Sequence, residues 1–323
     1  MFFISKNYLS SGLLIGLMVI YIIINVGCFT DTNLDRTQKN GKESSSFRPD
    51  KIPLYYGPKS ETGYQAILAT SDLSLGDNRF GFVITTPSGF LTLPKVQIKV
   101  WLTGSRKETL KSDEAIFQKW PYGNRGLYTT ILNFDHIGEW QADIDILSIE
   151  DGHTKISLNF NVDRTTDAPN VGDIAIPSSN RTIEDVVDIK ELTTGSLRDK
   201  DLYAITIANS LESNIPSVVV FASPAFCLNA VCGPQVEVLQ SLKTTFGEGA
   251  SFIHIDFYDN PREIQGDLTR AIISPTVREW GLPSSEWTFM IDEHGRVTNR
   301  FEGFANYNEL ANELATLLRV QPR

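Results

Sequence analysis

The sequence predicts two folded domains, an all-β sandwich followed by an α/β domain. Segments in which apolar and polar residues alternate, separated by turn residues, fill the stretch 60–165, and this period of two is typical of half-buried strands. The stretch 180–323 instead mixes continuous apolar runs with helical patterns, as in sheets that are covered by helices. A chain of 323 residues is long enough for about two domains.

The composition argues against a nucleic-acid partner. The formal net charge is −10, and no cluster of lysine and arginine provides the basic face that such a partner requires. The three cysteines are divided between a single Cys28 near the N-terminus and a close pair, Cys227 and Cys232.

The N-terminus predicts export from the cytoplasm. Residues 1–27 carry a weakly basic start and an apolar run over Leu13–Val26, which is short for a membrane span of about 20 residues and suits a signal peptide. The run ends in Ile-Asn-Val-Gly before Cys28 and resembles a bacterial lipobox, with Asn25 where leucine is usual. This resemblance implies that Cys28 is lipidated and holds the protein at the extracytoplasmic face of the bacterial cell membrane. An uncleaved anchor helix is the alternative.

The polar stretch 28–59 follows as a flexible tether, because it offers too little apolar surface to fold. Four clear alternating segments then come within 60–165: Val96–Leu102, Tyr128–Phe134, Trp140–Ile146 and Ile156–Val162. Turn residues separate them and no long helical run intervenes, which favours an antiparallel β-sandwich.

A short pattern within this region carries a resemblance. Gly126-x-Tyr128, Phe134 and Gly138-x-Trp140 resemble the immunoglobulin-like domains of bacterial exported proteins, which implies a spacer or a protein-binding surface. His136 and His153 lie in predicted turns without a cysteine, methionine or second histidine nearby. We therefore expect no metal site here.

The stretch 166–179 contains proline, glycine and asparagine without a period, so it predicts an interdomain linker. Beyond it, the pattern predicts helix, strand, helix, strand, helix, strand, strand and helix. The four strands are expected at Ser217–Ala222, Ser251–Tyr258, Trp287–Asp292 and Val297–Phe301, and helices are expected at Leu202–Leu211, after the cysteine pair, at Pro275–Trp280 and at Asn306–Val320.

Two segments resemble the thioredoxin family. Trp287–Val297 is similar to the family's strand and hairpin near its C-terminus, and Phe221–Pro234 has the family's spacing from a strand-ending phenylalanine to a helix proline. The resemblance implies a thioredoxin-like domain over 180–323, with Cys227 and Cys232 at its active site.

The cysteine pair departs from that family. The spacing is Cys-x4-Cys instead of Cys-x-x-Cys, and on one regular helix it would hold the Cα atoms about 8.6 Å apart, beyond the roughly 7 Å that a disulfide allows. Cys227 must therefore lie in the loop before the helix, or the first helical turn must unwind. Val220 replaces a buried aspartate of the family, and Glu286 occupies the position of its cis-proline.

The sequence therefore predicts a membrane-tethered, extracytoplasmic thiol–disulfide oxidoreductase that acts on protein thiols or disulfides and needs no cofactor. Cys227 would attack, and Cys232 would resolve the mixed disulfide. The alternative is a redox-silent interaction scaffold in which the two cysteines form a structural disulfide. Metal binding by the pair is a third possibility, but His254 and His294 lie in a strand and a turn, where structural roles are expected.

Overall fold

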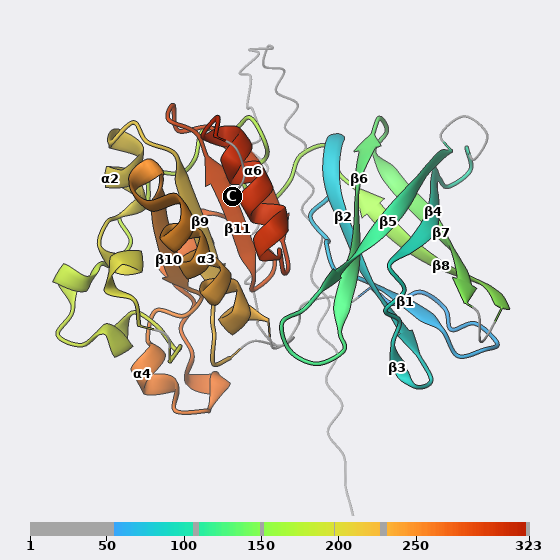
Figure 1. Cartoon of the computed structure of the whole chain (residues 1–323), viewed down its shortest axis with the longest axis horizontal. Coiled ribbons are helices and arrows are strands. Elements are labelled where there is room, and N and C mark those ends of the chain that lie inside the picture. Colours follow the sequence, from blue (N-terminus) through green and yellow to red (C-terminus); the bar gives the residue numbers. More distant parts are fainter. Residues whose placement is uncertain (1–54, 106–109, 149–151, 197, 227–230, 321–323) are drawn as a thin grey trace, which may run out of the picture. The chain divides into compact units, whose positions relative to one another are not determined.

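The computed structural model describes residues 55–105, 110–148, 152–196, 198–226 and 231–320 (Figure 1). Phe47–Arg323 form one compact unit that contains two β-sheets. The predicted signal peptide, Cys28 and nearly all of the predicted tether lie outside the described residues, so they stay predictions. In the described part of the chain, no helix is both long enough and apolar enough to span a bilayer.

The first sheet is antiparallel and has eight strands. The strands are β1 (Gln65–Leu68), β2 (Gly76–Thr86), β3 (Gly89–Phe90), β4 (Lys95–Leu102), β5 (Lys111–Lys119), β6 (Gly126–Phe134), β7 (Gly138–Ser148) and β8 (Gly152–Val162). Their order is β1-β2-β6-β5-β4-β7-β8, with β3 paired to β2. The first and last strands of this order contact each other, so the sheet nearly closes into a barrel.

The prediction of an immunoglobulin-like sandwich is therefore wrong. A sandwich needs two sheets that face each other, whereas β5 pairs with β4 on one side and with β6 on the other, which keeps all the strands in one sheet. The alternation located the strands correctly because it reports which face of a strand is buried. It does not report which strands are neighbours, and this decides between a sandwich and a barrel.

Aromatic side chains fill the interior of the barrel. Phe160 contacts both Phe80 and Phe134, with ring centroids 4.8 and 5.7 Å apart. Phe134 also meets the edge of Trp140 at 5.0 Å. Trp140 is fully buried, and its indole N–H donates to the carbonyl oxygen of His136 at 3.1 Å. The Phe134 and Trp140 pattern noted in the sequence is therefore a core contact within a single sheet.

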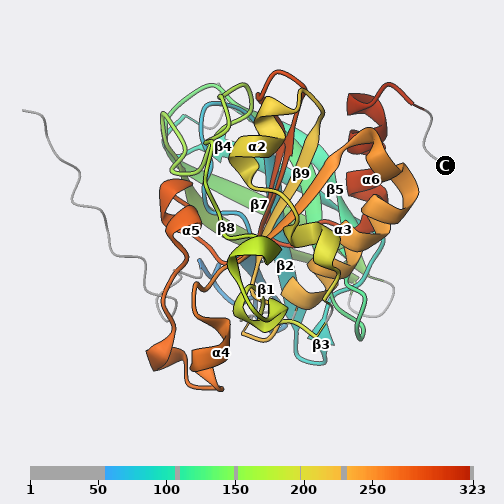
Figure 2. The ribbon, with the colours of Figure 1, turned by 90° about the vertical axis from the view of Figure 1, so that its left-hand side faces the viewer.

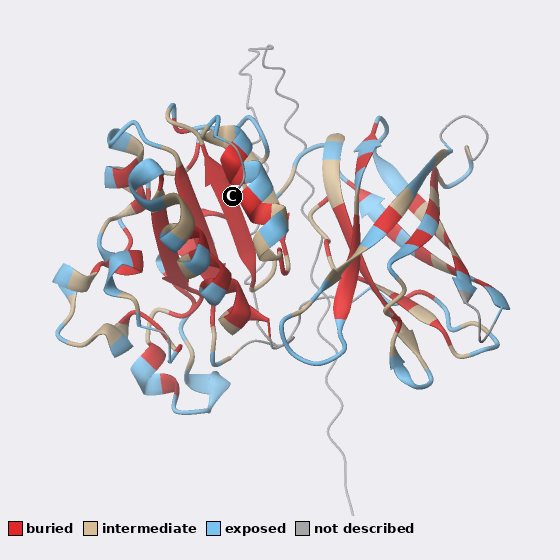
Figure 3. Cartoon of the chain, viewed as in Figure 1, coloured by how far each residue is buried: buried red, intermediate tan, exposed pale blue. Residues whose placement is uncertain are grey.

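The second sheet has four strands in the order β10-β9-β11-β12. These are β9 (Ser217–Ala222), β10 (Ser251–Asp256), β11 (Trp287–Ile291) and β12 (Val297–Glu302). Strands β9 and β10 are parallel, whereas β11 is antiparallel to both of its neighbours. Strands β9 and β11 are buried along their whole length (Figure 3), which explains their unbroken apolar sequences.

Helices lie on both faces of this mixed sheet (Figure 2). The α-helices are α2 (Ile207–Glu212), α3 (Cys232–Phe246), α4 (Pro261–Ile264), α5 (Pro275–Glu279) and α6 (Tyr307–Leu317). Short 3-10 turns supplement them at Ile183–Asp185, Ile189–Glu191, Lys200–Tyr203, Gly247–Gly249 and Leu268–Arg270. Alternate residues of β9 divide between the two faces: Val220 packs in one cluster with residues of α3 and α6, and Val219 packs in another with residues of α2 and α5.

The prediction of an α/β thioredoxin-like fold is also wrong. The second sheet is mixed and its helices are few, so the chain as a whole is mostly β. The strands lie where the apolar runs placed them, but the expected helix at Leu202–Leu211 is instead a 3-10 turn followed by the six-residue α2. The stretch before it contains only 3-10 turns. Short segments rich in capping residues satisfy their backbone groups locally and do not extend into full helices.

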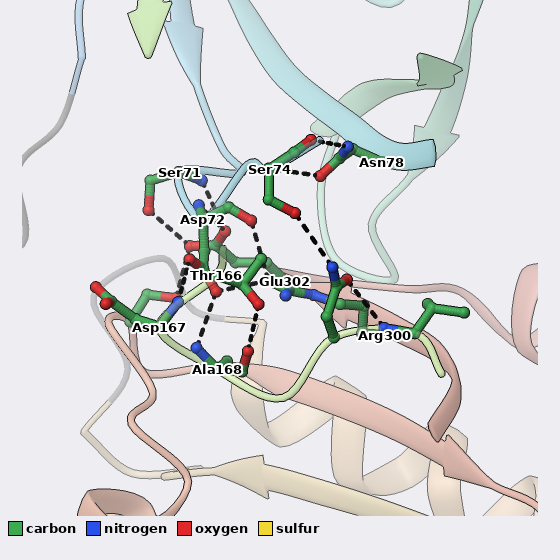
Figure 4. A network of polar contacts seen from close by, with 12 residues as sticks. Ser71, Asp72, Ser74, Asn78, Thr166, Asp167, Ala168, Arg300 and Glu302 are labelled. Carbon is green, nitrogen blue, oxygen red and sulfur yellow. Dashed lines mark hydrogen bonds and ion pairs between the residues drawn. The ribbon is translucent and has the colours of Figure 1, made fainter. Parts of the chain in front are cut away.

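A polar network connects the two sheets (Figure 4). The Glu302 carboxylate at the end of β12 accepts hydrogen bonds from the backbone and hydroxyl of Ser71, at 2.6 and 2.9 Å. Arg300 pairs with Asp72 at 2.7 Å and lies over the ring of Trp287 at 4.9 Å. Asp72 also accepts the backbone N–H groups of Asp167 and Ala168, so the start of the predicted linker is held against the barrel.

A second connection runs between β2 and α6. Arg79 donates to both carboxylate oxygens of Glu309, at 2.7 and 2.9 Å, and to the carbonyl oxygen of Phe304 at 2.8 Å. Apolar contacts accompany it, since Val83 and Leu127 of the barrel pack in the same cluster as residues of α3 and α6.

Candidate functional site

The candidate site lies where β9 ends and α3 begins. After Ala222, residues Ser223–Phe226 form a turn, and α3 starts at Cys232. Cys227 lies outside the described residues, so its position and role stay predictions. Cys232 is the one cysteine in the described part of the chain. It is fully buried and disulfide-bonded, and its partner lies outside the described residues.

The local sequence explains why Cys232 opens the helix. Pro234 stands in the first turn of α3, where its missing N–H group costs no helical hydrogen bond. Val231 precedes the helix without a side-chain cap, and Cys232 is the first helical residue, at the positive end of the α3 dipole. This end of a helix dipole stabilises a thiolate.

Pro224 is the packing centre of the turn. A Cβ atom built on Gly195 would lie 3.1 Å from the Pro224 ring, and one built on Gly233 would lie 3.9 Å from it. The proline therefore fits between the segment around Gly195 and the start of α3, next to Cys232. Larger residues at Gly195 would press on the turn.

A buried carboxylate lies beside this turn. Asp256, at the end of β10, is paired in register with Ala222 and is 4 % exposed. Burial raises its pKa to about 6. The hydrogen bonds from Thr194, Tyr258 and Ser223 lower the pKa, but their effect is smaller than that of burial. Asp256 is thus a group that changes its charge near neutral pH.

Thr194 connects Asp256 to the turn. The backbone N–H and the hydroxyl of Thr194 both donate to Oδ2 of Asp256, at 2.6 and 2.8 Å. The Oγ1 of Thr194 in turn accepts the backbone N–H of Ala225 at 3.2 Å and lies 3.1 Å from the hydroxyl of Ser223. A chain of hydrogen bonds therefore runs from the carboxylate to the backbone that leads into the cysteine segment.

The sequence reasoning missed Asp256. The thioredoxin resemblance places a buried aspartate at position 220 of β9, where this chain has valine, and it gives no expectation for the neighbouring strand β10. The available signal was a single acidic residue inside the apolar run Ser251–Tyr258, since an aspartate in a buried strand needs hydrogen-bond donors nearby.

His254 is the second buried titratable group of β10. It is 2 % exposed, with Nδ1 at 2.7 Å from the hydroxyl of Tyr203 and Nε2 at 3.1 Å from the carbonyl oxygen of Ala222. A carbonyl only accepts, so Nε2 carries the proton and Nδ1 accepts from the tyrosine. Burial lowers the pKa of His254 to about 4, so the ring is neutral and structural at pH 7.

The cavity at this edge of the sheet is small and polar. It has a volume of about 90 Å³ and is lined by Asn180, Arg181, Tyr203, His254, Asp256 and Thr276, among others. Such a volume holds a few water molecules, whereas sites for drug-sized ligands span about 300–1,000 Å³. The described residues contain no group of three or more His, Cys, Asp and Glu side chains that could hold a metal ion.

The other residues singled out in the sequence lie apart from this edge. Glu286 is buried just before β11, and its carbonyl oxygen accepts the N–H of Gly303. His294 is exposed in the turn between β11 and β12. In the barrel, His136 and His153 are exposed and lie 3.0 and 3.1 Å from the carboxylates of Asp135 and Asp145.

The comparisons with known proteins add no relative: no family model, no curated protein and no solved structure matches the chain.

Proposed function

We propose that the protein is a thiol–disulfide oxidoreductase that acts on protein thiols or disulfides outside the cytoplasm, tethered to the membrane through a lipid on Cys28. One observation carries the proposal. Cys232 is disulfide-bonded, fully buried, and placed at the first residue of α3 beside a turn held by Thr194. The position at the start of α3 supports a resolving role, because a helix N-terminus stabilises the thiolate that attacks the mixed disulfide.

The exchange requires two cysteines, and Cys227 is the proposed partner of Cys232. In the reducing direction, the Cys227 thiolate attacks one sulfur of a partner protein's disulfide, and the other sulfur leaves as a thiolate. The Cys232 thiolate then attacks the Cys227 sulfur and releases the partner's second thiolate. Two electrons pass to the partner and the Cys227–Cys232 disulfide forms. The opposite direction reverses the same steps.

Trapping tests the assigned roles. In Cys232→Ser the mixed disulfide on Cys227 cannot resolve, so we expect partner proteins to accumulate as adducts that dithiothreitol releases. Cys227→Ser is the matched control and should trap nothing at the same level. Equal trapping by the two variants, or none by either, would contradict the roles.

A redox-silent scaffold is the second candidate, and the complete burial of Cys232 favours it. The two functions differ in reduction potential. A value of the Cys232 disulfide below about −300 mV marks an inert structural bond, whereas an exchanging pair should equilibrate with glutathione. Equilibration in glutathione buffers, followed by alkylation and mass spectrometry, gives this value. Labelling with a fatty-acid analogue tests Cys28, and Cys28→Ser should lose the label.

A further inference from the structure

A groove lies between the barrel and the second sheet. It has a volume of about 570 Å³, and ligand sites span about 300–1,000 Å³. Strand β2 and helix α6 stand on its two sides (Figure 1), and β6, β12 and the linker residues Asn170 and Val171 complete its walls. No step of the proposed thiol–disulfide exchange involves these residues, so the groove is open to another role.

The two basic side chains of the groove are already paired within the fold. Arg79 donates to both carboxylate oxygens of Glu309, at 2.7 and 2.9 Å, and its side chain is only 5 % exposed. Arg300 pairs with Asp72 at 2.7 Å, and its side chain is 12 % exposed. Both ion pairs connect the barrel to the second sheet, so neither arginine offers its charge to an anionic ligand.

Two acidic side chains of the groove are available instead. Asp77 of β2 and Glu313 of α6 both line the groove and are exposed. The side-chain amide of Asn133 donates to Asp77 at 2.7 Å. The amide of Asn299 donates to Glu313 at 3.0 Å. An amide orients a carboxylate without neutralising its charge, and among the described residues no cation pairs with either carboxylate. The groove therefore favours a cationic ligand.

The groove also offers apolar surface and an open strand edge. Ile131 and Val171 line it and are 60 % and 52 % exposed. Strand β12, whose residues 298–301 form another wall, is the last strand of its sheet. The N–H of Gly303 donates across the pair, to the residue that precedes β11. The alternation of an antiparallel pair therefore directs the backbone N–H and C=O of Arg300 away from β11. An edge of this kind pairs with an extended segment of another chain.

From these features we propose that the groove binds an extended segment of a partner protein that alternates lysine or arginine with apolar residues. The backbone of the segment pairs with the edge of β12 at Arg300. Its cationic side chains pair with Asp77 and Glu313, and its apolar side chains, which point the other way in an extended chain, pack against Ile131 and Val171. The inference goes beyond the proposed function, because it requires neither cysteine and applies equally to an oxidoreductase and to a scaffold.

Calorimetric titration of the full-length protein with a capped peptide of sequence Lys-Val-Lys-Val-Lys tests the inference. The titration is made in salt of about 0.15 M, which screens attraction between distant exposed charges. The wild type should bind one peptide saturably, and the double variant Asp77→Asn/Glu313→Gln should bind it at least tenfold more weakly. Ile131→Lys, which brings a positive charge into the groove, should weaken binding at least as much. The matched control Glu61→Gln/Glu184→Gln removes two exposed carboxylates outside the groove and should stay within twofold of the wild type.

Equal weakening in the control and in Asp77→Asn/Glu313→Gln would overturn the inference, because the peptide would then be attracted by the acidic surface as a whole. So would a wild type that does not bind the peptide, or that binds Glu-Val-Glu-Val-Glu as tightly. Spermidine binding as tight as that of the peptide would assign the groove to a small cation instead. Should circular dichroism show a folding defect in the double variant, Ile131→Lys decides. Trapping by Cys232→Ser depends on the cysteines and this titration does not, so the two proposals fail separately.

Discussion

Strand β10 carries two buried titratable groups whose contributions to the free energy of unfolding change with pH in opposite directions. Asp256 and His254 stand two residues apart, and each has its pKa shifted by burial, upward to about 6 and downward to about 4. Their contributions to stability should largely cancel between pH 4 and pH 6.5. A variant that lacks one of the two groups should therefore show the pH dependence of stability that the other group produces.

The magnitudes follow from the pKa values. The pKa of Asp256 rises from 3.8 to about 6, and two units correspond to about 3 kcal/mol. Because the folded state holds this proton more tightly than the unfolded state, stability from this group is highest below pH 4 and is lost as the pH rises through about 6.

For His254 the sign is reversed. Its pKa falls from 6.5 to about 4, again worth about 3 kcal/mol. The unfolded chain takes up this proton at a higher pH than the folded chain does. The contribution of His254 to stability is therefore complete above pH 6.5 and is lost as the pH falls toward 4.

The perturbation is His254→Gln, which keeps an amide able to bond Ala222 and Tyr203 but does not titrate. Its free energy of unfolding relative to the wild type, from urea titrations at each pH, should fall by about 3 kcal/mol between pH 4 and pH 6.5. Asp256→Asn should show the opposite slope. All other titrating groups cancel in the difference. The reasoning would be refuted if the free energies of unfolding of both variants changed with pH in parallel with that of the wild type.

Two further predictions concern stability, each measured by urea unfolding. Asp72→Ala leaves the Arg300 side chain, which is only 12 % exposed, without its carboxylate and should cost about 3–5 kcal/mol. The control Asp77→Ala, at an exposed position of β2, should change the free energy of unfolding by no more than about 0.5 kcal/mol. Equal losses in the two variants would contradict a stabilising role of the Asp72–Arg300 ion pair. Trp140→Ala should cost about 3–5 kcal/mol because the ring is fully buried. Ile131→Ala, which is 60 % exposed, should cost far less, and comparable losses would contradict the barrel interior described above.

The sequence located the secondary structure well because burial leaves a direct trace in residue order. The unbroken apolar run at Ser217–Ala222 predicted β9 to the residue, and the leucines of Asn306–Val320 predicted α6 within a few residues. Both follow from the faces that each element buries.

The fold class could not be predicted in the same way. Pairing of β5 with both β4 and β6 depends on hydrogen bonds between distant segments, which leave no period in either strand. The resemblance at Trp287–Val297 concerned one hairpin, and such a hairpin also occurs in a sheet with few helices. The polar part of the site was hidden for a related reason: Thr194 and Asp256 are 62 positions apart, and neither forms a motif alone.

The polar network shows that the two predicted domains share part of their polar core. The Glu302 carboxylate is buried, and burial raises its pKa above the usual range, while donors from the barrel at Ser71 and Asp72 lower it. Without the barrel, this carboxylate would lose three of its hydrogen bonds, and Arg300 would lose its counter-charge. A buried charge without partners costs several kcal/mol. The barrel is thus more than a spacer, because it completes the polar core of the sheet that carries Cys232.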